Sequence, residues 1–213
     1  NKSINLISRK DEENIWTLHL LHSAAILFKL SFPPHASVLD LGTGGGLPGI
    51  PLKILAPGIS ITLLDSTQKK IKVVADIINT LGLTKASAVW GRAEDVGKMP
   101  DHHRRYDVVV ARAVGSIKDL VRWSKPLLKD TKHPRLRQSE GTEGDRDRRI
   151  PVEPPALIAL KGGDLQGELS SLTSRKSNLS IRIIDLTLKG STQFEEREKK
   201  IVLIEFGNAS RGE

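Results

Sequence analysis

The residues best suited to bind a ligand form a glycine cluster after a short apolar run. Five of the 18 glycines fall between Gly42 and Gly49, directly after Val38–Leu41 and next to Pro48 and Pro51. Glycine lets a backbone turn sharply and approach a ligand closely, and the start of a following helix presents free N–H donors. The pattern therefore predicts a strand, loop and helix that cradle a nucleotide-like cofactor.

Three known types of cofactor-binding loop are compared with this glycine pattern. Residues 44–49 satisfy the dinucleotide pattern G-x-G-x-x-G. In a dinucleotide loop, however, the first glycine directly follows the strand, and here that glycine is Gly42. Counted from Gly42, the pattern fails, because Leu47 stands where the third glycine is required. A Walker phosphate loop is excluded because no Lys-Ser or Lys-Thr follows the glycines. The remaining pattern, acid-x-Gly-x-Gly-x-Gly, resembles motif I of the class I S-adenosylmethionine-dependent methyltransferases. It is formed by Asp40, Gly42, Gly44 and Gly46.

A second carboxylate supports a cofactor site. Asp65 follows the apolar run Ile59–Leu64 and lies about 20 residues beyond the glycine loop, where α/β cofactor domains place an acid on the ribose hydroxyls. The alternative is that Asp65 only caps the helix expected at Gln68–Leu81, although Ser66 could fill that role. We favour the ribose contact because the two motifs occur together.

The elements around these motifs predict an α/β fold. Strands are expected at 38–41, 59–64, 86–90, 107–111, 156–160, 181–188 and 200–206, and helices at 11–30, 47–55, 68–81, 116–128 and 165–174. The first five strands do not alternate, as in a parallel sheet covered on both faces. The last two strands are too close for a helical crossover and should pair antiparallel. We predict a doubly wound, seven-stranded, mostly parallel sheet with an antiparallel last strand.

The chain is expected to divide at residue 35. Residues 1–35 would form a helical extension, truncated at its start because the numbering begins at Asn1, and residues 36–213 the cofactor-binding domain. A polar segment at 130–153 interrupts that domain, and we predict a flexible surface insertion. Its arginines could contact RNA, but the acidic residues between them favour a solvent-exposed surface loop without a partner.

Composition narrows the chemistry further. The 213 residues contain no cysteine, which excludes disulfides, thiolate-bound metal and a thiolate nucleophile. No run approaches the roughly 20 apolar residues that span a bilayer, so we expect a cytoplasmic protein without a membrane partner. The net charge of +8 favours a polyanion such as nucleic acid, or simply keeps the protein soluble. We expect a monomer.

Five motifs in order resemble one methyltransferase family. They are Gly42–Leu52, Leu63–Ser66 with Lys69 and Lys70, Gly91–Glu94, Ala111–Ala113, and Ala159–Gly162. This set resembles the ribosomal RNA small subunit methyltransferase G family, also called glucose-inhibited division protein B. The resemblance covers nearly the whole chain except the insertion. It implies methylation of N7 of a guanine in 16S ribosomal RNA with S-adenosylmethionine as the methyl donor, on free RNA or on the small ribosomal subunit.

The resemblance also implies site residues. The cofactor residues it implies are Gly42, Gly44, Gly46, Leu47, Asp65, Ala93, Glu94 and Arg112. Among them, Asp65 would contact the ribose, and Ala93 and Glu94 the adenine. Arg112 would lie at the end of the pocket where the methyl group is transferred, and it is the predicted catalytic residue. Contacts with RNA phosphates are expected from Lys69, Lys70, Arg92 and Lys161.

Other interpretations stay open at this point. Arg112 could grip guanine O6, a phosphate or the cofactor carboxylate, or form an ion pair with Asp107 or Asp119. Lys161 could be an exposed loop lysine. The chain could also methylate a small molecule or a protein, or bind RNA without catalysis.

The N-terminal helix and the tryptophans give weaker signals. Leu18-His19 and His22-Ser23 replace the Arg-His and Asp-Ser pairs usual in the resembling family. His19 and His22 lack a carboxylate at a recognised metal-site spacing, so we predict structural roles and no metal. The three tryptophans, Trp16, Trp90 and Trp123, fall on helix or strand patterns and are expected in the core; stacking on a nucleobase is the less favoured alternative.

Overall fold

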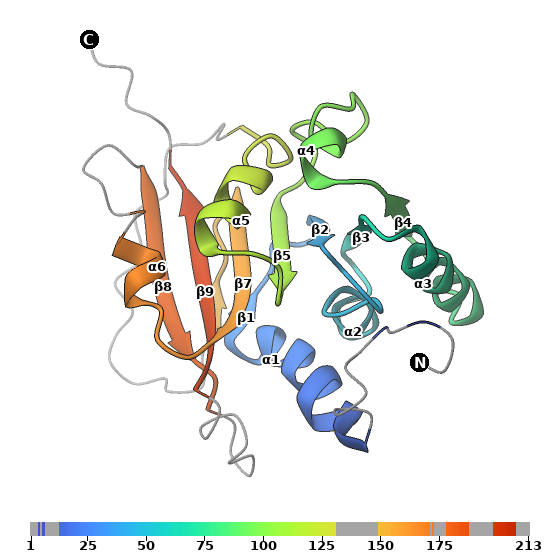
Figure 1. The fold of residues 1–213 in the computed structure, drawn as a ribbon, viewed down its shortest axis with the longest axis horizontal. Helices are drawn as coiled ribbons and strands as arrows, with labels where there is room; N and C mark the ends of the chain where they lie inside the picture. The colour runs from blue at the N-terminus through green and yellow to red at the C-terminus, as the bar shows by residue number, and fades with distance from the viewer. Residues whose placement is uncertain are drawn as a thin grey trace.

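One seven-stranded sheet organises the protein. The computed structural model describes Ile4, Leu6 and residues 13–130, 149–170, 172, 178–187 and 198–207. The strand order is β4-β3-β2-β5-β7-β9-β8 (Figure 1). The strands are β2 (Ser37–Leu41), β3 (Ser60–Asp65), β4 (Ala86–Trp90), β5 (Val108–Arg112), β7 (Ala156–Gly162), β8 (Leu179–Asp185) and β9 (Lys199–Phe206). Leu188, which was expected to end the sixth strand, lies outside the described residues.

The sheet confirms the predicted fold class. Strands β4, β3, β2, β5 and β7 pair in parallel, and β9 pairs antiparallel with both β7 and β8. The last strand of the chain therefore lies between β7 and β8 rather than at the edge. Val108 to Ala111 of β5 are all buried, as their unalternating sequence predicts for a strand covered on both faces.

Helices cover both faces of the sheet. They are the π-helix η2 (Trp16–Leu21), α1 (His22–Lys29), α2 (Gly49–Leu55), α3 (Gln68–Thr80), α4 (Ala93–Val96), α5 (Ile117–Ser124) and α6 (Gln166–Ser170). Side chains of α1, α2 and α3 pack against one face, and those of α4, α5 and the α6 segment pack against the other. None of the described helices is long and apolar enough to cross a membrane.

Local chemistry sets the ends of α5. Ser116 precedes the helix, and its Oγ accepts a hydrogen bond from the backbone N–H of Asp119 at 3.1 Å. The predicted helix ran to Leu128, but α5 ends at Ser124. Pro126 follows closely, and its lack of an N–H removes the next helical hydrogen bond.

The N-terminal helix shares the core of the sheet domain. Ala25, Ile26 and Leu30 belong to the same buried cluster as Val38. Beyond α1, the short strand β1 (Leu30–Ser31) pairs in parallel with β6 (Ile150–Pro151), a pairing that the sequence did not predict. The division at residue 35 stays a prediction.

The segment predicted as an insertion is folded at its end. Val152 is buried, and its N–H donates to the carbonyl oxygen of Ser31 at 3.0 Å. Residues 149–153 therefore take part in the fold through the apolar side chains of Ile150 and Val152, contrary to the expectation of a surface segment outside it. Residues 131–148 of this segment lie outside the described residues.

Two tryptophans correct the predicted core. Trp16 is 75% exposed and Trp90 is 57% exposed, so placing them in the core was wrong. Trp123 is half-buried and packs against the cluster that contains Leu120 and Val121 of α5. The sequence pattern therefore identified the helix or strand that carries each tryptophan. It did not show how much of each tryptophan side chain the neighbouring elements cover.

Candidate functional site

The glycine loop after β2 is built on left-handed backbone. Gly42, Gly44 and Gly46 have φ angles of +71°, +58° and +90°. A Cβ on Gly42 would lie 2.5 Å from Cγ2 of Val114, and one on Gly46 would lie 2.8 Å from Cγ1 of Ile50. The fold itself therefore requires glycine at these two positions.

Gly44 differs from its neighbours in the loop. Among the residues that the structure describes, a Cβ there would meet only the carbonyl oxygen of Leu6 within 4 Å, at 3.8 Å. Because Gly44 also lines a cavity of about 820 Å³, that Cβ would enter open space in this cavity. The absence of a side chain at Gly44 therefore preserves room for a ligand.

Asp40 ties the two ends of this loop together. Its Oδ2 accepts hydrogen bonds from the backbone N–H of Gly49 at 2.7 Å and from the hydroxyl of Thr43 at 2.6 Å. Asp40 is fully buried, and this burial raises the pKa of its carboxyl group to about 7, although the two hydrogen bonds oppose the rise. The acid of the glycine motif therefore holds the loop from beneath.

Asp65 holds the loop from the neighbouring strand. Its Oδ2 accepts from the N–H of Gly44 at 2.9 Å, and its Oδ1 accepts from the N–H of Thr67 at 2.8 Å. The N-cap residue of α3 is Thr67, with no side-chain cap, so neither Asp65 nor Ser66 is the N-cap of this helix. Asp65 orders the turn before α3 and also faces two cavities, which leaves carboxylate lone pairs for a ligand.

Two cavities meet at Asp65, at the carboxyl ends of the parallel strands. The larger has a volume of about 820 Å³ and the smaller about 130 Å³. Residues lining both cavities are Gly42, Asp65, Ser66 and Val114. The site thus has two lobes joined at one carboxylate.

The predicted site residues divide between these lobes. The larger lobe is lined by Gly42, Gly44, Leu47, Asp65, Lys70, Arg112 and Lys161, and the smaller by Gly42, Asp65, Arg92, Ala93 and Glu94. Gly46 and Lys69 are not among the lining residues of either lobe. The structure therefore brings most of the predicted residues together, whereas Gly46 shapes the loop and Lys69 lies outside.

Arg112 projects into the larger lobe from the end of β5. Its Nη1 lies 2.9 Å from Nδ1 of His19 and 3.5 Å from the carbonyl oxygen of Leu18. A guanidinium can only donate, so Nδ1 of His19 accepts and the imidazole is neutral with its proton on Nε2. His19, for which we predicted a structural role, is a wall of the cleft.

The predicted ion-pair alternatives for Arg112 are wrong. Asp107 binds the ammonium group of Lys129 at 2.9 Å, and Asp119 pairs with Arg122 at 3.2 Å. Arg112 is therefore positioned by the N-terminal helical segment, far away in the sequence. The histidine that Leu18-His19 shares with the Arg-His pair of the resembling family is the sequence signal that could have indicated this contact.

His22 lies beside His19 on the cleft wall. Burial, together with the charges of Lys199 and Arg112, lowers the pKa of His22 to about 3, so its imidazole is neutral at pH 7. Among the residues that the structure describes, no group of three or more His, Asp or Glu side chains could hold a metal ion. This end of the cleft is therefore lined by neutral imidazoles and permanent cations.

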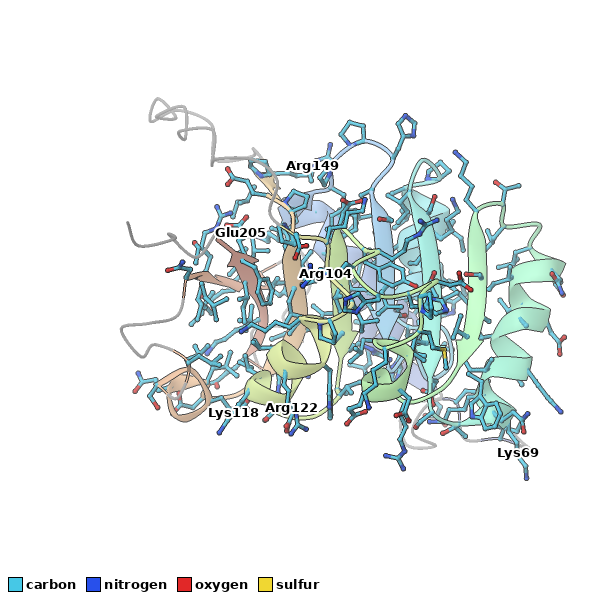
Figure 2. All side chains as sticks on the ribbon, turned by 90° about the horizontal axis from the view of Figure 1, so that it is seen from above. Lys69, Arg104, Lys118, Arg122, Arg149 and Glu205 are labelled. Atoms are coloured by element: carbon cyan, nitrogen blue, oxygen red, sulfur yellow. The ribbon has the colours of Figure 1, made fainter. Side chains whose placement is uncertain are left out.

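The expected RNA-binding cations have different surroundings. The ammonium group of Lys161 donates to the carbonyl oxygen of Gly115 at 2.9 Å and to Oε2 of Glu168 at 3.0 Å, and the side chain is only 14% exposed. The alternative of an exposed loop lysine is therefore wrong. Arg92 and Lys69 are exposed, and Figure 2 shows Lys69 pointing outward at the rim of the molecule. Contacts between these cations and RNA stay a prediction.

Solved structures similar in fold include proteins named as methyltransferases. A predicted O-methyltransferase from Agrobacterium tumefaciens aligns with a TM-score of 0.57 and 12% identity over 90% of this chain and 82% of that protein. A SAM-dependent methyltransferase from Aquifex aeolicus aligns with a TM-score of 0.55 and 12% identity, over 92% and 94% of the two chains. These similarities establish the fold.

Sequence relatives are more specific. The family model of rRNA small subunit methyltransferase G matches residues 1–134. The ribosomal RNA small subunit methyltransferase G of Porphyromonas gingivalis is 40% identical over 79% of this chain and 66% of that protein. The enzyme of the same name from Moorella thermoacetica is 32% identical over 86% of this chain and 75% of that protein. The chain thus belongs to the rRNA small subunit methyltransferase G family.

Proposed function

We propose that this protein transfers the methyl group of S-adenosylmethionine to N7 of a guanine in 16S ribosomal RNA. The observation that carries the proposal is the two-lobed cleft, with Asp65 lining both lobes and Arg112 lining the larger one. A nucleoside with a charged tail needs this arrangement of a small lobe, a ribose-binding carboxylate and a wider channel.

The residues present fit the proposed cofactor. The smaller lobe, beside Ala93 and Glu94, would take the adenine ring. Asp65 would accept hydrogen bonds from the ribose hydroxyls, since each of its oxygens is bonded to one backbone N–H and retains further acceptor capacity. The methionine portion would run past Gly44 and Leu47, where no Cβ of residue 44 obstructs the channel.

Methyl transfer to guanine N7 requires alignment of the reacting atoms and no proton transfer. When bound, S-adenosylmethionine supplies a methyl group on a positively charged sulfur. Guanine N7 carries a lone pair and no proton at neutral pH, so the chain needs no general base. Alignment of the reacting atoms can supply about 7–11 kcal/mol of the barrier. The Arg112 guanidinium, oriented by His19, is placed to donate to guanine O6 or to an adjacent phosphate.

The partner is ribosomal RNA, and its phosphates would meet a basic surface. The net charge of +8 favours association with a polyanion, and Lys70 and Arg92 lie at the edges of the two lobes. Lys161, which is paired with Glu168, would contribute less to phosphate binding than these two. We propose that the enzyme acts as a monomer in the cytoplasm, where ribosomal RNA is found.

Mapping of the methylated position tests this function. Purified protein is incubated with S-adenosylmethionine and either free 16S RNA or isolated small subunits from cells that lack the activity. Borohydride reduction and aniline cleavage then break the RNA at N7-methylguanine, and primer extension locates the break. We expect one new stop, much weaker with Arg112→Ala after the same short incubation. Labelling of protein or of small molecules without any RNA cleavage would contradict the proposal.

A further inference from the structure

Trp90 is a large apolar residue that the fold leaves uncovered beside the cleft. It ends β4, the edge strand of the sheet, and is 57% exposed. Strand alternation places it on the same face as Ala86 and Ala88, which pack against the cluster formed with α3. Trp90 lies level with the loop before α3, where that helix does not cover it.

The indole of Trp90 is nevertheless fixed in place. Its Nε1–H donates to the carbonyl oxygen of Ser66 at 3.1 Å, and Ser66 lines both lobes of the cleft. In the sheet, Trp90 is also in register with Asp65, the junction of the two lobes. Because the only polar atom of the indole is already bonded within the chain, Trp90 offers a partner mainly its apolar surface.

Exposed cations follow both Trp90 and its hydrogen-bond partner Ser66 in the chain. Arg92 follows two residues later and is exposed, and Lys69 lies exposed in the first turn of α3 (Figure 2). Of the nearest acids, Glu94 lines the smaller lobe and Asp95 pairs with Lys98. A flat apolar surface among cations matches a nucleobase joined to phosphates, because the ring stacks while the cations bind the backbone.

We propose that Trp90 is a stacking platform for an unpaired RNA base next to the guanine that enters the cleft. The strand would pass over Arg92 and Lys69, with its phosphates near both side chains. This inference rests on the proposed function and adds a specific contact to it. The stacked base must be unpaired, because a base within a duplex does not expose its face to a protein side chain.

Binding of a single-stranded oligoribonucleotide tests the platform. The probe is fluorescently labelled RNA of about 12 nucleotides that contains guanine, titrated at low salt without cofactor and followed by anisotropy. Trp90→Ala should weaken binding about tenfold, whereas Trp90→Phe should bind nearly as tightly because phenylalanine also stacks. Leu81→Ala is the matched control, since Leu81 is a similarly exposed apolar residue at the opposite end of α3. Its affinity should be unchanged.

Two further readouts separate stacking from other roles. RNA should quench the tryptophan fluorescence of the wild type more than that of Trp90→Phe, because a stacked base quenches the indole directly. Affinity for S-adenosylmethionine, measured by calorimetry, should be equal in the wild type and Trp90→Ala. Loss of cofactor affinity in Trp90→Ala would overturn the inference, since Trp90 would then serve the cofactor lobe.

The failure of this inference differs from the failure of the proposed function. If the wild type binds the probe and Trp90→Ala binds it within twofold, the platform is wrong but the RNA substrate stands. If the wild type binds neither the probe nor 16S RNA, the proposed function itself is contradicted. An equal effect of Trp90→Ala on single-stranded and duplex RNA would also overturn stacking on an unpaired base.

Discussion

Replacement of Gly44 by alanine should weaken cofactor binding while leaving the protein folded. The φ angle of +58° places residue 44 in the left-handed region, which costs an L-residue about 1–2 kcal/mol. The described part of the chain adds no steric cost, because within it the new Cβ would have only the Leu6 carbonyl oxygen within 4 Å, at 3.8 Å. We therefore expect the free energy of unfolding to fall by about 1–2 kcal/mol. The methyl group would occupy space that the cofactor needs.

Gly46→Ala is the matched control in the same loop. Its φ angle of +90° is also left-handed, but its Cβ would lie 2.8 Å from Cγ1 of the buried Ile50. Overpacking adds about 1–3 kcal/mol to the backbone cost. Gly46→Ala should therefore destabilise the fold by about 2–5 kcal/mol, more than Gly44→Ala.

Two assays read the pair of variants. Urea unfolding gives the free energies, and calorimetric titration with S-adenosylmethionine gives the affinities at a temperature where each variant is folded. Gly44→Ala should raise Kd about tenfold or more, because overpacking of a bound ligand costs about as much as overpacking of a core. Cofactor affinity of Gly44→Ala within twofold of the wild type would refute the assignment of this loop.

Three other residues give direct tests. The pKa of His22 lies at about 3, below the ordinary 6.5, so the folded state loses stability as pH falls through this range. At pH 5 the loss is about 2 kcal/mol, and His22→Leu should abolish it in urea unfolding compared at pH 7.5 and 5. The pKa of Asp40 is raised to about 7, so stability falls as pH rises from about 4 to 7, and Asp40→Asn should flatten that slope in the same assay. Arg112→Ala should lower kcat about 100-fold and leave the calorimetric Kd for S-adenosylmethionine nearly unchanged; the opposite pattern would assign Arg112 to cofactor retention.

Local sequence pattern was sufficient for most of the sheet and for the cofactor loop. Unalternating apolar runs such as Val108–Ala111 predict buried parallel strands because both faces of such strands are covered. The glycines of the loop and Asp65 occur at spacings set by the turn from strand to helix. These features depend on residues close together in the chain, so they are visible in it.

Features that depend on distant pairing were not visible in the sequence. The contact between His19 and Arg112 joins residues 93 positions apart. The insertion of β9 between β7 and β8 and the pairing of β1 with β6 likewise follow from tertiary packing. The strand pattern at 86–90 predicted the element that carries Trp90, but not that α3 fails to cover this side chain. Lys161 was expected to contact RNA phosphate. Its ion pair with Glu168, which lies beyond the next loop, was not predicted.

A crystal structure with S-adenosylhomocysteine tests the central claim most directly. We predict that adenine occupies the smaller lobe beside Ala93, that the ribose hydroxyls donate to Asp65, and that the sulfur faces the larger lobe that Arg112 lines. S-adenosylhomocysteine bound away from Asp65 would contradict the account. Binding in the reverse direction, with the amino acid portion in the smaller lobe, would contradict it as well.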